Sequence, residues 1–372
     1  MKVCIVTRID YRNYGNRLQN YALTMLLADE GLEVISGLQI RSKETWVKGS
    51  NKAIRILKVL TPFWLYRKIM IGEIAKQKKR KAGDERRRAF IDFTKTYINT
   101  IPPLIIKNDT HLAKLLEIYG FDYYIAGSDQ VWNPKFSGND YEFLTFAPME
   151  KRLSFAASFG VDSIPPKKKD QFAAALKAMK YISVRESQGV KIARELTGRD
   201  DIDLSMDPTL LLDIDKWEKI IATEDIRKPE HYIATYFLGD LPDEIKLFAE
   251  GNHLPILKLN NKEQYDLYNI SPIGFLSILH DADYVFTDSF HALAFSIKFH
   301  REFYVFERRE KDQVNMFSRL ESLLQMLNIN KRIITQNVII QEKISYEKWK
   351  EIDEFLLSQK ELSMKKIKDR ML

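Results

Sequence analysis

The stretch 283–306 constrains the fold of this chain most, because its pattern is compatible with few arrangements. An apolar run over 284–287 predicts a buried strand, followed by a short polar turn. A helix is then expected to open at Phe290 or His291, before a second strand over 303–306. A strand that feeds a helix through a tight turn leaves free backbone N–H groups at the helix start. Because open α/β sheets bind anions at such turns, the pattern predicts a parallel α/β sheet with an anion site.

The first turn of this predicted helix carries His291. An ordinary histidine pKa of about 6.5 suits general acid or base catalysis at neutral pH. From spacing alone, this role and a structural role, in which the ring packs against or caps the helix, are equally supported. Asp288 and Asp207 also close predicted strands, and each either orients a cation or hydroxyl or caps the next element of the chain.

Arg185 is a second candidate for binding an anion. It ends a predicted strand over 182–185. A guanidinium at that place can hold a carboxylate or phosphate through paired hydrogen bonds. The alternative is an ion pair with Glu186 or Glu195.

The first residues of the chain predict a βαβ unit. The runs 2–9 and 33–37 are apolar strands, and 17–30 has apolar residues on one helical face. The loop after the first strand lacks the GxGxxG pattern of dinucleotide-binding folds. Gly15 in this loop would let the backbone approach a ligand and Asn16 would cap the helix, but an ordinary capped turn is about equally favoured.

A further predicted strand, 121–125, runs into the sequence AGSDQVWNP. Gly127 allows a turn there, and Ser128 and Asp129 then stand at the carboxyl end of the strand. Side chains at such strand ends converge on a cleft. Trp132 either walls a sugar or acyl pocket or, as is commoner for tryptophan, lies in the core.

The length of the chain and the order of its elements predict two domains. A chain of 372 residues is too long for one ordinary core. Strands alternate with helices again after a junction that we expect between Gly160 and Tyr181. We therefore predict α/β domains over 1–170 and 171–340, and terminal helices over 341–372 that pack back on the first domain.

The segment 42–96 interrupts the first domain as a basic helical insertion. The net charge of the chain is +7, whereas residues 43–88 carry +11, with fifteen Lys and Arg against four Asp and Glu. Aliphatic and aromatic residues interleaved with cations suit a helix on an anionic membrane surface. A solvated helical insertion is about equally supported, and a nucleic-acid arm is the weakest of the three interpretations.

Several classes of protein are excluded. Cys4 is the lone cysteine, so disulfides and cysteine metal clusters are excluded and a reducing compartment is expected. No secretory signal is visible, and no run approaches the roughly 18 apolar residues of a spanning helix. Because HExxH, Walker and GxSxG patterns do not occur, no metal is indicated.

Six sequence motifs, which occur in a fixed order, indicate a family, whereas periodicity indicates only a fold class. They are YGNRLQNYAL, DYYIAGSDQVWN, SFAASFG, ISVRE, DPTLLL and DADYVFTDSFHALAFSI. Through them the chain resembles the polysaccharide pyruvyl transferase family over most of its length, except the basic insertion and the last thirty or so residues. Each motif is weak alone, but the ordered set is specific to the family.

The resemblance implies a fold similar to GT-B glycosyltransferases, with two Rossmann-like domains facing across a cleft. It implies transfer of a pyruvyl group from phosphoenolpyruvate to two hydroxyls of a sugar, which forms a ketal and releases phosphate with no further cofactor. Arg185 would hold this donor and His291 would be the general acid. The expected donor-site residues are Arg185, Asp288, Ser289, Phe290 and His291, and the expected cleft residues are Gly15, Asn16, Arg17, Gly127, Ser128, Asp129, Gln130 and Trp132.

The chain departs from the family pattern at Ser289, where the best-understood members have an arginine. Arg17, Lys298 and Arg308 are the candidates to compensate. The principal alternative function is a nucleotide-sugar glycosyltransferase of similar fold, and the third is a non-catalytic carbohydrate-binding relative. We expect a cytoplasmic enzyme that acts on a polysaccharide or lipid-linked oligosaccharide at the inner membrane face. We expect anionic lipid as a further partner, and no binding of nucleic acid.

Overall fold

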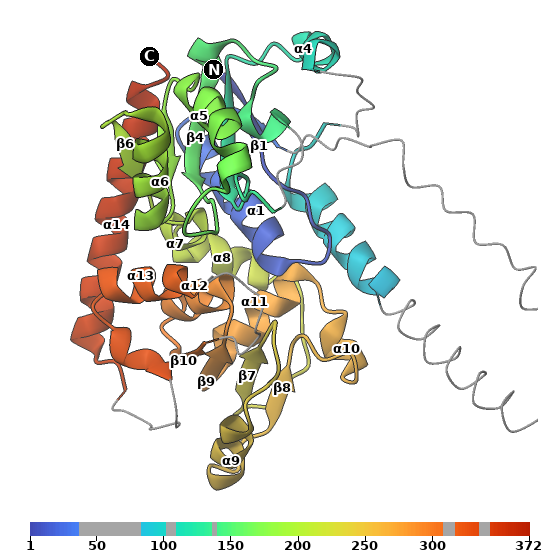
Figure 1. The fold of residues 1–372 in the computed structure, drawn as a ribbon. Coiled ribbons are helices and arrows are strands. Elements are labelled where there is room, and N and C mark those ends of the chain that lie inside the picture. The colour runs from blue at the N-terminus through green and yellow to red at the C-terminus, as the bar shows by residue number, and fades with distance from the viewer. Residues whose placement is uncertain (37–82, 102–108, 136–139, 308–316, 335–342) are drawn as a thin grey trace, which may run out of the picture.

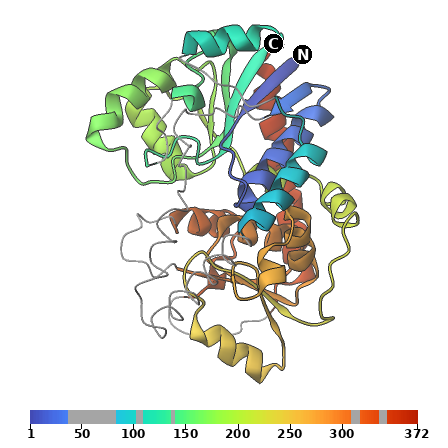
Figure 2. The ribbon, with the colours of Figure 1, turned by 90° about the vertical axis from the view of Figure 1, so that its right-hand side faces the viewer.

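The computed structural model describes residues 1–36, 83–101, 109–135, 140–307, 317–334 and 343–372. Most of the predicted basic insertion, 42–82, therefore lies outside the described residues. The described chain forms two α/β domains, one above the other, each built on a parallel sheet (Figure 1). This is the GT-B-like arrangement that the motifs predict. Both chain ends lie at the outer end of the first domain (Figure 2).

The first sheet has six parallel strands in the order β2-β1-β3-β4-β5-β6. They are β1 (Lys2–Val6), β2 (Glu33–Ser36), β3 (Tyr123–Asp129), β4 (Arg152–Ala157), β5 (Ile182–Val184) and β6 (Ile202–Leu204). Their apolar runs are mostly buried, as a parallel sheet covered on both faces requires. The helices of this domain include α1 (Tyr14–Asp29), α4 (Asp109–Glu117), α5 (Lys169–Lys177) and α6 (Ser187–Thr197).

The first sheet extends past the predicted boundary between 170 and 171. Strand β5 pairs with β4, and β6 pairs with β5 through the register Ile182↔Ile202. Two strands that the sequence places in the second domain therefore belong to the first. Helix α5 is an ordinary crossover helix between neighbouring parallel strands. Its sequence does not differ from that of a helix that links two domains, so the sequence alone places the boundary there.

The second sheet has five parallel strands in the order β11-β10-β9-β7-β8. They are β7 (Ile233–Tyr236), β8 (Ile256–Lys258), β9 (Tyr284–Thr287), β10 (Glu302–Phe306) and β11 (Ile333–Ile334). The helices of this half are α7 (Pro208–Leu211), α8 (Ile214–Ile221), α9 (Asp243–Gly251), α10 (Tyr265–Tyr268), α11 (Pro272–Asp281), α12 (Phe290–Lys298) and α13 (Ser318–Met326). Strand β9, helix α12 and strand β10 confirm the strand–turn–helix–strand prediction for 283–306.

Both sheets have a switch point in their strand order. Strand β1 lies between β2 and β3, and strand β7 lies between β8 and β9. Loops that leave neighbouring strands on opposite sides of a sheet open a crevice at the carboxyl ends of those strands. Asp129 ends β3 and Asp288 follows β9, so predicted site residues lie at both switch points.

One apolar core runs through both domains. Tyr14, at the start of α1, stacks on Phe275 of α11, with ring centroids 4.3 Å apart and planes 9° apart. The Tyr14 hydroxyl also donates to the carbonyl oxygen of Ile270 at 3.1 Å. The domains are therefore packed against each other directly beside the start of α1.

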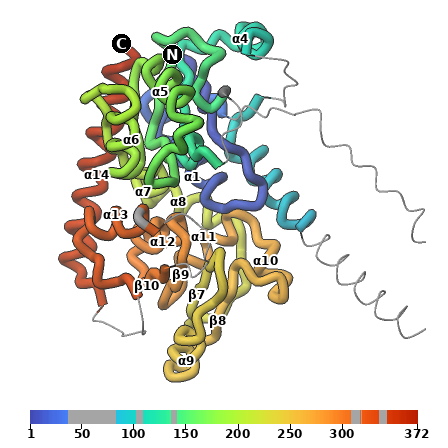
Figure 3. The backbone as a smooth tube through the Cα atoms, in the orientation of Figure 1, coloured from blue at the N-terminus to red at the C-terminus, as the bar shows by residue number. Residues whose placement is uncertain are grey.

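The expected terminal helices are one long helix, α14 (Tyr346–Asp369), which runs along both domains (Figure 1). Near its start, Asp353 lies 3.0 Å from His300 of the second domain. Near its end, Lys368 pairs with Glu30 of the first domain at 2.7 Å. The chain trace thus crosses to the second domain around α8 and returns along α14 (Figure 3). Within the described residues, no helix has both the length and the hydropathy to cross a membrane.

A helix over 83–97 ends the predicted insertion and joins the two domains. Its Arg86 side chain is 2% exposed and lies 4.5 Å from the Tyr14 ring and 4.6 Å from the Tyr268 ring. The guanidinium donates to the carbonyl oxygens of Tyr268 at 2.8 Å and Arg12 at 3.1 Å. Arg86 therefore links the loop before α1 to α10 of the second domain.

We predict that Arg86→Ala destabilises the protein by about 2–4 kcal/mol, because two carbonyl oxygens lose a charged donor and two rings lose a stacked cation. Urea unfolding followed by tryptophan fluorescence measures the change in midpoint. Arg88→Ala is the matched control, since Arg88 is a more exposed arginine on the same helix. Equal midpoints for the two variants would contradict the role given to Arg86.

Candidate active site

Helices α1 and α12 bring His291 against Gly15. His291 is in the first turn of α12, whose N-cap residue is Ser289. A Cβ atom at position 15 would lie 2.0 Å from His291 Nδ1, so only glycine leaves room for the ring. The close approach predicted for Gly15 is thus made by a histidine of the other domain. The N-cap of α1 is Asn13, and Asn16 lies inside the helix.

Arg185 and His291 meet at Asp207. Arg185, directly after β5, brings Nη1 to 2.5 Å from Asp207 Oδ2. His291 Nε2 lies 3.8 Å from the same oxygen. The other oxygen, Oδ1, accepts from the backbone N–H of Thr209 at 3.0 Å and so caps α7. Asp207 therefore has both of the roles that its place in the sequence left open.

Charge pairing and burial determine how this cluster is protonated. Burial opposes ionisation of Asp207, but the charges of Arg185 and His291 hold the pKa of its carboxyl below the usual range. Burial also lowers the pKa of His291, an effect that Asp207 opposes and Arg185 reinforces. At neutral pH the free protein thus contains an ionised Asp207 beside an imidazole that burial shifts toward its neutral form.

Glu186 and Phe290 complete the surroundings of Arg185. Glu186 Oε2 lies 3.9 Å from Arg185 Nε, so the ion pair expected as an alternative is present but long. Glu186 Oε1 accepts from the Ser158 hydroxyl at 2.8 Å. The Arg185 guanidinium also stacks over the Phe290 ring, 4.6 Å from its centroid. These contacts hold the guanidinium at the boundary between the domains.

Asp129 faces the same charges from the end of β3. Asn16 Nδ2 donates to Asp129 Oδ2 at 2.8 Å. Burial opposes its ionisation, but His291, Arg185 and this hydrogen bond lower the pKa of Asp129 to about 2. Asp129 also has a positive φ of 72°, a backbone conformation that aspartate tolerates better than most residues. Asp129 and Asn16 are both predicted cleft residues. They bind each other, and the Asp129 carboxylate interacts electrostatically with His291.

The other predicted residues at the end of β3 have separate surroundings. Gly127 has a φ of 117°, and a Cβ there would lie 2.4 Å from the carbonyl oxygen of Phe155, so glycine is required. The Ser128 hydroxyl lies 3.3 Å from Asp207 Oδ2 and so joins the charged cluster. Gln130, with its amide oxygen toward Arg319, accepts from both terminal nitrogens of that arginine.

Trp132 does not wall the cleft. It is fully buried, stacks on Phe143 with ring planes 5° apart, and donates from Nε1 to the carbonyl oxygen of Glu142 at 3.2 Å. Of the two interpretations of Trp132, the core residue is therefore the one that the structure supports. The indole also packs against Phe159, with ring centroids 5.3 Å apart.

Asp288 holds the second switch point together. Its two carboxylate oxygens accept from the backbone N–H groups of Leu238 at 2.8 Å and Gly239 at 3.0 Å, in the loop after β7. The Ser289 N–H donates to Thr287 Oγ1 at 3.0 Å. Because these bonds stay within the second domain, Asp288 organises the loops around α12, and its role in the donor site stays a prediction.

Two of the three cations expected to compensate for Ser289 lie in the part of the chain that the structure describes. Arg17 is buried against Asn16, and its Nη2 donates to the carbonyl oxygen of Arg8. Lys298 is at the opposite end of α12 and donates to the carbonyl oxygen of Leu210. Arg308 is outside the described residues.

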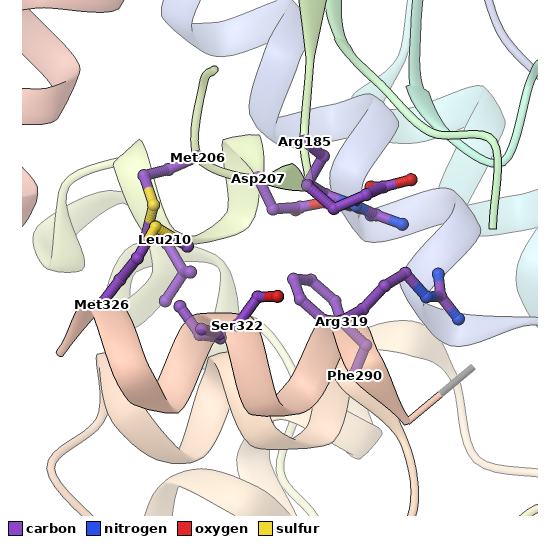
Figure 4. A pocket seen from close by; sticks show the side chains of 10 residues that line it. Arg185, Met206, Asp207, Leu210, Phe290, Arg319, Ser322 and Met326 are labelled. Atoms are coloured by element: carbon purple, nitrogen blue, oxygen red, sulfur yellow. Dashed lines mark hydrogen bonds and ion pairs between the residues drawn. The ribbon is translucent and has the colours of Figure 1, made fainter. Parts of the chain in front are cut away.

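A small cavity lies beside Arg185, between the two domains (Figure 4). It is lined by Arg185, Glu186, Asp207, Phe290, Arg319 and Met326, among others. Sequence reasoning missed Arg319 altogether. Its place in an amphipathic helix beside apolar residues carries no local signal, because only the tertiary packing of α13 brings it to Arg185.

We predict that Gly15→Ala displaces the His291 ring, because the added methyl group would overlap the imidazole. Overpacking of this kind costs about 1–3 kcal/mol, against a small gain in helix propensity. A crystal structure of the variant and its thermal unfolding measure both effects. Gly251→Ala is the control, since a Cβ there meets no atom within 4 Å. An unmoved ring in the variant would contradict the close approach.

Known proteins resemble this chain at two levels. Among solved structures it is similar to a protein from Listeria monocytogenes described as a UDP-N-acetylglucosamine 2-epimerase, at TM-score 0.48 and 12% identity, over 100% of this chain and 90% of that chain. It is also similar to the UDP-GlcNAc 2-epimerase of Methanocaldococcus jannaschii, at TM-score 0.46 and 10% identity, over 96% of this chain and 93% of that chain. No curated protein gives a significant match. The family model described as Polysaccharide pyruvyl transferase matches residues 13–310, and the chain therefore belongs to the polysaccharide pyruvyl transferase family.

Proposed function

We propose that the protein transfers a pyruvyl group from phosphoenolpyruvate to two hydroxyls of a sugar in a polysaccharide or lipid-linked oligosaccharide. The buried cluster of Arg185, Asp207 and His291 carries the proposal, because it joins an anion-binding group to a titrating one between the domains. The enzyme would act in the cytoplasm at the inner membrane face, with the segment 42–96 contacting anionic lipid.

The proposed reaction forms two C–O bonds and breaks one. Both acceptor oxygens bond to C2 of phosphoenolpyruvate, and the bond from C2 to the phosphate oxygen breaks. Of the two hydroxyl protons, one ends on C3, which becomes a methyl group, and the other leaves with the phosphate. The site must therefore bind an anion and move protons in its presence.

His291 is the proposed proton donor. In the free protein burial favours its neutral form. A bound phosphate adds negative charge beside the ring and favours the imidazolium. The charged ring can then protonate the enol carbon or the leaving phosphate. Binding of the donor thereby also favours the protonated form of His291 that acts as the acid.

Arg185 is the proposed donor ligand, and Asp207 is a positioning residue. A guanidinium matches the geometry of phosphate and carboxylate groups. Asp207 holds one edge of the Arg185 guanidinium, which leaves the remaining N–H groups to the ligand. The free N–H groups in the first turn of α12 would add hydrogen bonds to the same anion.

The proposed acceptor lies on the side of Asp129 and Asn16. Asp129 stays ionised at neutral pH, since its pKa is about 2. An ionised carboxylate beside His291 can accept a hydrogen bond from a sugar hydroxyl and orient it toward the donor. The two substrates would then enter from the switch points of different sheets.

Phosphate release tests the reaction. The enzyme is incubated with phosphoenolpyruvate and galactose- or mannose-containing acceptors, either free or lipid-linked in anionic vesicles. We expect inorganic phosphate and a product that gains a carboxyethylidene group by mass spectrometry. His291→Ala should slow turnover by about 100-fold or more. His231→Ala is the control, because that side chain is 69% exposed.

Other outcomes would point to the alternatives. An absence of phosphate release with every acceptor, together with binding of a nucleoside diphosphate, would support a nucleotide-sugar glycosyltransferase. Carbohydrate binding that survives His291→Ala, without turnover in the unaltered protein, would support a non-catalytic relative.

We predict that the pKa of His291 rises when phosphoenolpyruvate binds. The free-protein pKa is below the ordinary value, mainly because of burial. The donor anion stabilises the charged ring, so the shift must be upward. Proton NMR of the histidine C2–H signals across pH measures it, and His291→Ala identifies the signal. A pKa that stays constant or falls on binding would refute the proposed role.

A further inference from the structure

A second buried arginine shares the cavity with Arg185. Arg319, in the first turn of α13, is 8% exposed and lines the cavity beside Phe290. Figure 4 shows Arg319 on the helix that forms one wall, with Arg185 and Asp207 on the opposite wall. Each of the two walls therefore contributes an arginine to the lining, which also includes Glu186 and Asp207.

The two arginines belong to different domains. Arg185 follows β5 of the first sheet, whereas Arg319 is in α13, which packs against α12 of the second domain. Burial is the main cause of the lowered pKa of His291, and Asp207 opposes it. The positive charges of Arg185 and Arg319 each lower this pKa further. An anion near His291 would therefore meet positive charge from both domains.

Arg185 has hydrogen-bonding capacity that the protein does not use. Its Nε and Nη2 atoms are buried and have no hydrogen-bond partner among the described residues. Leaving a buried charged donor unpaired is unfavourable, so a ligand that supplies an acceptor to these two atoms would gain affinity from them.

Gln130 of the first domain binds the Arg319 guanidinium of the second domain. With the amide oxygen of Gln130 toward it, Arg319 donates from its two terminal nitrogens at 3.0 and 3.1 Å. The cavity that both arginines line measures about 10 Å³, room for on the order of one water molecule. A larger anion would therefore displace the Arg319 side chain from Gln130.

We propose that Arg319 and Arg185 form a two-arginine site that binds the two anionic groups of the donor and so connects the domains. Phosphoenolpyruvate carries a carboxylate and a phosphate close together, and each matches the planar fork of one guanidinium. The identity of this donor rests on the proposed function. Arg319 lies beyond residues 13–310, so the family match does not predict it. It supplies a cation to a site that has Ser289 at the start of α12.

Direct binding tests the two-arginine site. Titration calorimetry with phosphoenolpyruvate, and separately with inorganic phosphate, is carried out on the full-length protein and on Arg319→Gln and Arg319→Lys. We expect Arg319→Gln to weaken phosphoenolpyruvate binding about 10- to 100-fold, and Arg319→Lys to retain part of the affinity. In turnover assays, KM for the donor should rise more than kcat falls.

Arg332→Gln is the matched control for loss of a buried arginine. Arg332 is 4% exposed, pairs with Glu302 at 2.7 Å in the same domain, and does not line the cavity. Thermal unfolding of both variants separates stability from affinity. Equal donor affinities for Arg319→Gln and the unaltered protein, or equal losses in Arg319→Gln and Arg332→Gln, would overturn the two-arginine site while leaving the proposed reaction intact. Failure of the unaltered protein to bind phosphoenolpyruvate would overturn both.

Discussion

The carboxylate of Asp207 is the interaction on which the site depends. Its Oδ2 atom lies 2.5 Å from Arg185, 3.3 Å from Ser128 and 3.8 Å from His291. A buried carboxylate is costly unless charged and hydrogen-bonding partners surround it. The ends of β3, β5 and β6 and the start of α12 must therefore be assembled together. The buried charge of Asp207 is therefore compensated only when both domains are folded and packed together.

Much of this arrangement is predictable from local pattern. The run 284–287 reads as a strand and is one, and His291 opens the following helix as its spacing indicates. Arg185 is predictable at a site because it directly follows the apolar run 182–184, at the carboxyl end of a strand, where open α/β sheets bind ligands. Local pattern suffices here because each of these residues comes directly after the element that positions it.

Other features depend on contacts between distant parts of the chain. Trp132 lies next to site residues in sequence but packs into the core, because the backbone departs from the extended strand conformation at Asp129, where φ is 72°. Arg319 reaches the cavity only through the packing of α13 against α12. The membership of β5 in the first sheet likewise depends on strand pairing, which no short-range period encodes.

Helix α14 is attached to both domains, to Glu30 in the first and to His300 in the second. Proteins with two domains around a cleft commonly admit ligands by rotation about a hinge. A helix fastened at both ends opposes that rotation, because opening would break its contacts with one domain. Rearrangement of side chains within the cleft is then the less costly route for a ligand. The backbone around the site is therefore expected to keep nearly the same shape in the free and the occupied protein.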